Sequence, residues 1–497
     1  MALSNYIPLG WNRKTALLVV LAASFLALYP CLGNGFTNWD DGTYLLDNPW
    51  VLSLESGNFV RIFSSLHQGL YKPLVFVTFA LEHYFFGFNP FVYHAVNLAF
   101  HLANCALVFL LVERLSASWS AAFVTALLFG IHPMHVESVA WVSERKDMLY
   151  SFFFLLSAWL YLRYRDKGSA PAYWGAVAAY LLSLLSKPFG IALPALLFLF
   201  DWLQRRPVDK KFWTDKIPFM ALGICFTGAA YFTVKLSGVL FSRQASLLEK
   251  AQLLSYSFLF YVAKAFWPSG LSVIYPYPLK NAHPASYTYG PLLLAAWFVA
   301  VAYLCRGRRL ALFGMLFFML TLMPGLQWLP AAPSLAMDHY SYIPYIGLFM
   351  AVAVPVLDWL KAAAPFWPRV AAVVFSAAVL ALGFSARGRC AVWQDGCALW
   401  SDMLAKHQQP IAYVNRAACL IERGEHAAAL PDLERAIELN ADYHLAYSNR
   451  ALVFAAFGDQ GKALADMRRS VALAPKVGSL RFRLGMFLLE RGQAEEA

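Results

Sequence analysis

Phe36-Thr37-Asn38-Trp39-Asp40-Asp41-Gly42-Thr43-Tyr44 lies a few residues past the first long apolar run of the chain. The adjacent carboxylates of Asp40 and Asp41 would stand close to a membrane surface, where a charged group is costly unless it has a function. A solvated turn that begins the next helix is the alternative interpretation. The rest of the chain decides between the two, because it shows which other groups share this side of the membrane.

The chain is far more apolar than an average soluble protein. Of its 497 residues 60% are hydrophobic and 14% are charged, and the mean hydropathy is +0.52. These values predict an all-α, polytopic membrane protein. The apolar runs stop near Phe384, and a charged, alanine-rich tail follows. We therefore predict a transmembrane domain at 1–388, a linker helix at 389–409 and a soluble tail at 410–497.

The net charge of +11 is spread over short loops, which is typical of membrane orientation and not of a nucleic-acid surface. We expect no nucleic-acid partner. The seven cysteines are scattered and form no CxxC pair. Cys390 and Cys397, if carried by one helix, would lie too far apart to form a disulfide. No Asn-x-Ser/Thr acceptor occurs, which favours a bacterial membrane over the endoplasmic reticulum.

About eleven segments are apolar enough to cross a bilayer, allowing for tilt. They are centred near residues 23, 102, 126, 156, 179, 196, 228, 298, 317, 351 and 377. With Arg13 and Lys14 inside, every basic loop falls on the cytoplasmic side. The apolar segment 252–267 would reverse this orientation if it crossed, so we interpret it as a re-entrant or interfacial helix.

An odd number of spans places several polar segments together on the outer face. They are the Asp40-Asp41 pair, the loop 132–147, the Lys187-Pro188 break, the loop 337–344 and the C-terminal tail. This coincidence favours one outward-facing active site over a solvated turn.

The tail carries a repeat of 34 residues. Tyr413, Gly424 and Ala429 recur as Tyr447, Gly458 and Ala463, and Pro475 closes the second unit. The spacing is that of tetratricopeptide repeats (TPRs), with units predicted at 410–443 and 444–477 and a partial unit at 478–497. A coiled coil would need a seven-residue period, which is absent. Such arrays bind extended peptides or partner proteins.

Sugar transfer from a lipid phosphate to a hydroxyl needs a base for the acceptor proton and cations for the leaving phosphate. Asp40 and Asp41 are candidates for the base. Since neighbouring side chains diverge, we expect Asp40 to face the acceptor and Asp41 to anchor the loop. Candidate cations on the same face are Lys72, Arg145, Lys146 and Lys187. Each alone is more often a headgroup-level residue than a ligand, but Lys187 interrupts an apolar stretch and needs a partner.

A polar stripe runs along the second span, where His94, Asn97, His101 and Asn104 recur at intervals of three and four. The stripe must face the bundle, either as interhelical contacts or toward substrate. His132, His135 and Glu137 could be drawn as a metal site. We predict no metal, because no fourth ligand is evident and arginines and lysines can bind a phosphate.

Four stretches together resemble the GT-C membrane glycosyltransferases that carry C-terminal TPRs, above all the eukaryotic transmembrane-and-TPR (TMTC-type) O-mannosyltransferases and their bacterial relatives. The stretches are Asn38-Trp39-Asp40-Asp41, Tyr71-Lys72-Pro73-Leu74, the run His132-Pro133-Met134-His135-Val136-Glu137-Ser138-Val139-Ala140, and Ser186-Lys187.

The resemblance implies an outward-facing site, a polyprenyl- or dolichyl-phosphate sugar donor, an inverting transfer and an acidic base in the first outer loop. It places Arg145 where relatives have an Arg beside an acidic residue. The loop 337–344 resembles an acidic-Arg-Tyr motif with Asp338 and Tyr340, but His339 stands where an Arg is expected. A histidine offers a conditional charge in place of a fixed fork.

We therefore expect an enzyme that moves mannose or a similar hexose to hydroxyls of an exported protein, which the TPR tail would recruit. Membrane lipids and the lipid-linked donor are the other expected partners. Transfer to a glycan or lipid is one alternative, and a non-catalytic TPR scaffold or lipid-carrier translocator is another. We expect a bacterial inner membrane with the N-terminus cytoplasmic and the tail periplasmic. The alternative is the endoplasmic reticulum with a luminal tail.

Overall fold

The computed structural model describes residues 12–67, 71–236, 246–277, 284–326, 334–491 and 493. Contacts within the chain divide it into two compact units. The membrane unit comprises Met1–Asn34 and Thr43–Ala391. The repeat unit comprises Gly35–Gly42 and Val392–Ala497.

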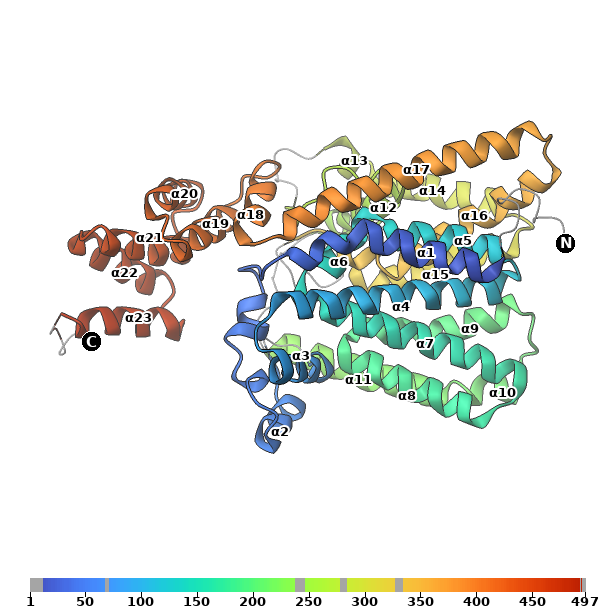
Figure 1. Ribbon diagram of the computed structural model, residues 1–497, viewed down its shortest axis with the longest axis horizontal. Coiled ribbons are helices and arrows are strands. Elements are labelled where there is room, and N and C mark those ends of the chain that lie inside the picture. The colour runs from blue at the N-terminus through green and yellow to red at the C-terminus, as the bar shows by residue number, and fades with distance from the viewer. Residues whose placement is uncertain are drawn as a thin grey trace. The chain divides into compact units, whose positions relative to one another are not determined.

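The membrane unit is built of helices, several of which run alongside one another in Figure 1. They are α1 Arg13–Leu28, α2 Ser56–Ser64, α3 Pro73–Phe86, α4 Pro90–Ser116, α5 Trp119–Ile131, α6 Val136–Ala140, α7 Arg145–Lys167, α8 Ala170–Ser186, α9 Leu193–Leu203, α10 Lys210–Thr214, α11 Ile217–Leu236, α12 Leu247–Phe266, α13 Ala285–Thr288, α14 Gly290–Leu304, α15 Arg309–Leu322, α16 Pro344–Ala362 and α17 Phe366–Cys390.

Local sequence explains many of the helix starts. A proline stands in the first turn of α3, α4, α8, α9, α14 and α16, where its missing N–H removes no intrahelical bond. Asn12, Asn89 and Ser118 cap α1, α4 and α5 with their side chains. Packing also depends on small residues. A Cβ on Gly314 of α15 would lie 2.9 Å from the Cβ of Ala351 in α16, so these helices approach closely.

Five helical segments of the described chain are long and apolar enough to cross a membrane, or six if the bent pair of α5 and α6 is one span. The five are Arg13–Gly33, Pro90–Ser116, Lys210–Thr233, Pro344–Ala362 and Phe366–Trp393. Each span centre predicted from the sequence lies within a helix. The prediction of an all-α, multi-pass membrane protein is confirmed. The number of spans remains a prediction, as does the path of 252–267, which lies in α12.

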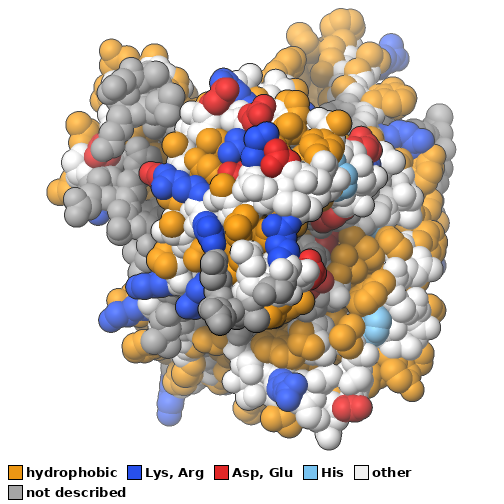
Figure 2. Space-filling model, turned by 90° about the vertical axis from the view of Figure 1, so that its left-hand side faces the viewer, with side chains coloured by type: hydrophobic (Ala, Val, Ile, Leu, Met, Phe, Trp, Pro, Cys, Tyr) orange, Lys and Arg blue, Asp and Glu red, His pale blue; other side chains and the backbone are white. Residues whose placement is uncertain are grey.

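Apolar side chains cover much of the outside of the membrane unit. Leu18, Val373 and Phe384 are 66%, 70% and 71% exposed, and Figure 2 shows hydrophobic side chains spread over the flanks of the molecule. Burial in lipid would remove this surface from water.

The basic loops predicted to be cytoplasmic are tied together by ion pairs. Arg165 lies 2.6 Å from Asp215, Lys216 lies 2.6 Å from Asp201, and Arg206 lies 2.8 Å from Asp166. Arg114 also pairs with Asp166. The helix α10 lies at the end of the bundle opposite α2 and α3 (Figure 1). The basic loops therefore share one end of this unit, as the sequence predicted.

The repeat unit contains α18 Gly396–Leu404, α19 Pro410–Glu422, α20 His426–Leu439, α21 His444–Ala456, α22 Gln460–Leu473 and α23 Gly478–Leu489. The starts of α19 and α20 recur 34 residues later in α21 and α22. Gly424 and Gly458 end the first helix of each pair with φ of +77° and +80°, a conformation that favours glycine. Arg416 binds Asp432 through two hydrogen bonds, and Arg450 repeats this contact with Asp466.

Two features of the repeat unit differ from the predicted domain boundaries. The expected linker 389–409 contains α18, which packs on α19 and is joined to it by the Cys397–Cys419 disulfide. The segment Gly35–Gly42, far earlier in the chain, also folds with the repeats. Hydrogen bonds that join residues more than 350 positions apart hold this early segment, which is why its place in the repeat unit does not follow from local sequence.

Candidate active site

A buried cluster of charges occupies the membrane unit around Glu144, in the short turn Val142–Glu144 that precedes α7. Lys146 Nζ lies 2.8 Å from Glu144 Oε1, and Lys187 Nζ lies 3.6 Å from Oε2. The Lys187 ammonium also binds Asp147, in the first turn of α7. The sequence predicts a phosphate as the partner of Lys187, and in the structure two carboxylates pair with this lysine. An anion such as a phosphate would compete with them for the same cation.

His339 joins the cluster from the loop before α16. Its Nδ1 lies 2.6 Å from Glu137 Oε1, and its Nε2 lies 3.8 Å from Glu144 Oε1. Burial lowers the pKa of His339 well below its ordinary value. Burial therefore disfavours the charged imidazolium, whereas an arginine in this position would keep a fixed charge.

The neighbours of His339 are also buried. Asp338 accepts a hydrogen bond of 2.7 Å from the Tyr275 hydroxyl. The Tyr340 ring lies 5.5 Å from Lys187 Nζ and packs on Phe189. The loop 337–344 and the Lys187 break thus meet in space, although about 150 positions separate them.

Lys72 adjoins this cluster through the ring of Tyr44. Its Nζ lies 3.1 Å from the ring centre of Tyr44, and Lys146 Nζ approaches the same ring at 5.3 Å. Both lysines are buried. Tyr44 follows Asp41 by three residues in the chain, so a cation–π contact connects the segment after the carboxylate pair to the lysine cluster.

Arg145, a predicted phosphate-binding residue, contacts other protein groups in this structure. Its guanidinium is fully buried and contacts both carboxylate oxygens of Glu82 in α3. One of these contacts is a hydrogen bond of 3.2 Å to Glu82 Oε2. The guanidinium also donates to Asn97 Oδ1 and to the Tyr93 carbonyl. Its N–H groups are therefore engaged by α3 and α4, and the geometry is that of a helix-packing residue. Phosphate binding by Arg145 would require these contacts to break.

The polar stripe of α4 makes interhelical contacts. Asn97 donates to the carbonyls of Val139 and Trp141, and His101 lies 2.7 Å from the Tyr342 hydroxyl and 3.0 Å from the Gly130 carbonyl. His94 is 1% exposed and faces the same interior. Of the two interpretations left open by the sequence, these contacts favour the interhelical one for His101.

The predicted metal-site candidates turn toward separate partners. His132 lies 3.2 Å from the Ala265 carbonyl, beside a largely apolar cavity of about 540 Å³, and His135 lies 2.7 Å from the Phe129 carbonyl. Glu137 faces His339. A different set, Glu144, Asp147 and His339, has ligand atoms within 4.8 Å of one another. Because Lys187 and Lys146 already pair with these two carboxylates, the group does not favour a divalent ion.

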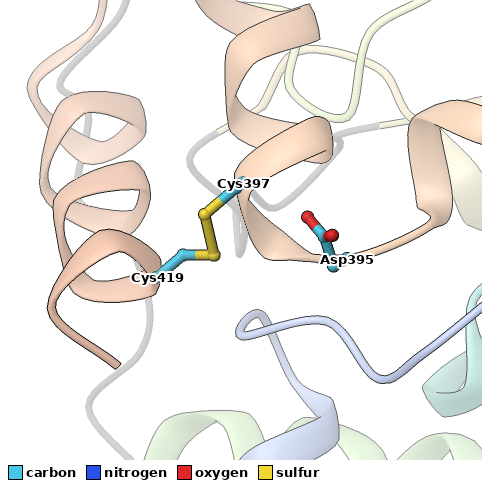
Figure 3. A group of neighbouring side chains, drawn as sticks. All are labelled: Asp395, Cys397 and Cys419. Atoms are coloured by element: carbon cyan, nitrogen blue, oxygen red, sulfur yellow. A yellow bond between two sulfur atoms is a disulfide. The ribbon is translucent and has the colours of Figure 1, made fainter. Parts of the chain in front are cut away.

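A second group with metal-like proximity, Asp395, Cys397 and Cys419, lies in the repeat unit (Figure 3). Its two sulfur atoms are joined as a disulfide. They are therefore not available as thiolate ligands.

The carboxylate pair lies in the repeat unit, and its two members differ. Asp41 is 1% exposed, and its Oδ2 accepts hydrogen bonds of 2.9 Å from both the backbone N–H and the hydroxyl of Thr37. Asp40 is partly exposed. The contacts of Asp41 close the loop on itself, as an anchoring residue would.

Sequence reasoning gave no role to Glu144, Asp147, Glu82 or Tyr44. Glu82 left a signal, since it is an acidic residue within the apolar stretch 73–86 and such a residue needs a partner. Glu144 immediately precedes α7 and Asp147 lies in its first turn, so their spacing of three residues places both carboxylates on the same side. Nothing in the local sequence identifies Tyr44.

Known proteins similar in sequence to this chain belong to the family that the motifs resemble. No family model matches the chain. The protein O-mannosyl-transferase TMTC1 of Mus musculus is 38% identical over 124 residues, which cover 25% of this chain and 13% of that protein. Tmtc2 of Drosophila melanogaster is 31% identical over 209 residues, covering 39% and 22%, and F38B6.6 of Caenorhabditis elegans is 28% identical over 207 residues, covering 39% and 29%. The matched segments are thus under a third of each relative's length.

Two solved structures share low sequence identity with the chain. ArnT from Cupriavidus metallidurans, bound to undecaprenyl phosphate, is 16% identical with a TM-score of 0.40, covering 93% of this chain and 80% of that one. The Archaeoglobus fulgidus oligosaccharyltransferase is 11% identical with a TM-score of 0.42, covering 84% and 58%. The resemblance inferred from the motifs is confirmed by the curated relatives: this chain is similar to the TMTC-type protein O-mannosyl-transferases.

Proposed function

We propose that the chain is a glycosyltransferase that moves mannose or a similar hexose from a polyprenyl-phosphate carrier to a hydroxyl of an exported protein. One observation carries the proposal. Residues of three motifs distant in sequence, 132–147, Ser186-Lys187 and 337–344, meet in one buried cluster of lysines, carboxylates and an imidazole. The named activity of the relatives supports the same interpretation.

The chain's residues fit an inverting displacement. The acceptor hydroxyl oxygen attacks the anomeric carbon of the sugar, and Asp40 takes the hydroxyl proton. The bond between that carbon and the phosphate oxygen breaks, and the phosphate leaves with the electron pair. Lys187 and Lys146 stabilise the negative charge on the leaving phosphate by exchanging their protein carboxylates for it. Asp41 holds the loop through Thr37.

The direct test uses the purified full chain, a radiolabelled polyprenyl-phosphate mannose and a peptide that bears serine and threonine hydroxyls. The expected product is the peptide with a single added sugar. Label appearing only in lipid or glycan would move the acceptor to those classes. No transfer to any acceptor, with donor binding intact, would favour the scaffold.

The first prediction concerns the side of the membrane on which the repeat unit lies. Asp40 belongs to this unit, so the proposed outward-facing base requires the repeat unit to be outside the cell. The Cys397–Cys419 disulfide supports that side, because disulfides persist in oxidising compartments. We expect a cysteine in place of Gly461 to react with an impermeant maleimide in intact cells and one in place of Val208 to be protected. The exposed Cys225 is first replaced by serine. The reverse pattern would invert the topology and remove the proposed outer site.

Donor binding gives the second prediction. Replacing Lys187 alone would leave Asp147 and Glu144 with an unbalanced buried charge, so the fold would suffer together with binding. The variant is therefore Lys187→Met combined with Asp147→Asn. Its affinity for the polyprenyl-phosphate sugar should fall about 10-fold to 100-fold, the value of a charge-assisted hydrogen bond shielded from water.

The measurement is a titration of purified protein with the lipid donor. Lys361→Met is the matched control, because Lys361 also pairs with an aspartate, Asp358, but in the last turns of α16, at the end of the unit predicted to be cytoplasmic. Its affinity for the donor should not change. An unchanged affinity in the Lys187 variant as well would leave Lys187 as a structural residue.

A further inference from the structure

We infer that the repeat unit holds the carboxylate loop in its working position, with Asn38 as the point of attachment. This inference rests on the proposed function, in which Asp40 is the base. It assigns a positioning role to Asn38, Gly396 and Trp400, residues that do not themselves take part in the chemistry. The repeats would then serve catalysis as well as the recruitment of a partner.

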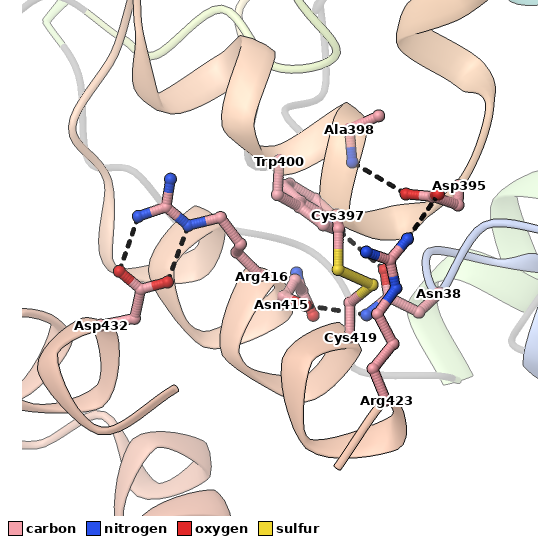
Figure 4. Close-up of a disulfide and its surroundings, with 10 residues drawn as sticks. All are labelled: Asn38, Asp395, Cys397, Ala398, Trp400, Asn415, Arg416, Cys419, Arg423 and Asp432. Atoms are coloured by element: carbon pink, nitrogen blue, oxygen red, sulfur yellow. Dashed lines mark hydrogen bonds and ion pairs between the residues drawn. A yellow bond between two sulfur atoms is a disulfide. The ribbon is translucent and has the colours of Figure 1, made fainter. Parts of the chain in front are cut away.

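Asn38 is bound on both sides of its amide. Its Nδ2 donates to the Asn415 carbonyl in α19 at 2.8 Å, and its Oδ1 accepts a hydrogen bond of 2.9 Å from Trp400 Nε1 in α18 (Figure 4). Two satisfied hydrogen bonds fix both the position and the rotamer of this side chain. The next residue, Trp39, packs edge-on against Trp400 with 5.0 Å between ring centres.

The backbone of the loop is held as well. Gly35 N–H donates to the Gln394 carbonyl at 2.8 Å, which places the start of the loop beside the start of the repeat unit. A Cβ built on Gly396 would collide with the Asn38 amide. Only glycine leaves room for Asn38 at this position, so the first residue of α18 is shaped to receive the loop.

The disulfide connects the two helices that hold Asn38. Cys397 follows Gly396 in α18, and Cys419 lies one turn beyond Asn415 in α19 (Figure 4). Arg423 adds a hydrogen bond of 2.7 Å to Asp395, the cap of α18. Because α18 and α19 are cross-linked, Trp400 and the Asn415 carbonyl keep a fixed separation. The loop can therefore bind the repeat unit through Asn38 in only one position. The hydrogen bonds between Thr37 and Asp41 would then orient Asp40 within the bound loop.

The test is Gly396→Ala in the full chain. The added methyl should displace Asn38, so hydrogen exchange of residues 35–42 should speed up while α20–α22 stay protected. Transfer should slow about 10-fold to 100-fold in kcat, in line with the effect of an ångström-scale misplacement, while the KM for the lipid donor stays unchanged. Gly461→Ala is the matched control, because its Cβ would meet only Asp459 Oδ1 at 3.9 Å.

A double variant separates positioning from loss of fold. Asn38→Ala removes the side chain that the added methyl would strike, so the effects of Gly396→Ala and Asn38→Ala on kcat should be clearly less than additive. Unchanged exchange of residues 35–42 in Gly396→Ala would overturn the attachment. Faster exchange with full kcat would overturn the positioning role. An inactive wild type with normal exchange would instead count against the proposed function.

Discussion

Replacing Asp40 by Asn is expected to lower the transfer rate about 10²-fold to 10⁴-fold, the usual contribution of a general base. Asn is nearly isosteric with Asp but cannot take the acceptor proton at neutral pH. Asp40 is the partly exposed member of the pair, so the substitution should spare the fold. The measurement is turnover of purified protein with radiolabelled donor and a hydroxyl-bearing peptide, with thermal unfolding recorded in parallel.

The neighbouring substitution is the control. Asp41 accepts two hydrogen bonds from Thr37, and an Asn at that position can still accept them through its amide oxygen. Asp41→Asn should therefore lower the transfer rate less than Asp40→Asn does and leave the loop largely ordered. Equal losses would mean that the carboxylates act as a unit or that a metal bridges them. Full activity in both variants would remove the pair from the mechanism.

Replacing Arg145 by Met should destabilise the membrane unit by about 3 to 5 kcal/mol, the cost of leaving one partner of a buried ion pair alone. Glu82 would remain buried at 8% exposure without its guanidinium. The contacts of Arg145 to Asn97 and the Tyr93 carbonyl would be lost as well. Thermal unfolding of the protein in detergent measures the effect as a fall in Tm.

The compensating variant is Arg145→Met with Glu82→Leu. Because the unpaired carboxylate is then absent, much of the lost stability should return. Arg145→Met with an unchanged Tm but weaker binding of the lipid donor would contradict the packing role. That result would restore the expectation that Arg145 contacts the donor phosphate.

Regular spacings in the sequence predicted the positions of the helices correctly. The 34-residue spacing of Gly424 and Gly458 located the helix pairs of the tail, because each glycine ends a helix in a conformation that other residues avoid. The three-and-four spacing of the polar residues in α4 correctly predicted that these residues face the interior of the bundle. Apolar length located the helices of the membrane unit, since every buried backbone group there must be paired within a helix.

What the sequence did not show are contacts between distant segments. Glu82 is marked in the sequence as an acidic residue within an apolar stretch, but only the structure reveals that its partner is Arg145. Lys187 was correctly singled out as a buried charge. The local sequence does not show whether Lys187 pairs with protein carboxylates, such as those of Asp147 and Glu144, or with a bound phosphate. Among seven cysteines, spacing alone did not select Cys397 and Cys419.

The attachment of Asn38 also sets the order of events during synthesis. Trp400 and Asn415 follow it by 362 and 377 residues. A ribosome adding about 5 to 20 residues per second needs about 18 to 75 s to reach them. Throughout that interval the carboxylate loop lacks its binding partners. In the proposed topology, these partners would come together only after the tail has been exported and the Cys397–Cys419 disulfide has formed. A newly inserted chain would therefore hold donor without turning it over, and its activity would appear as the last step of its biogenesis.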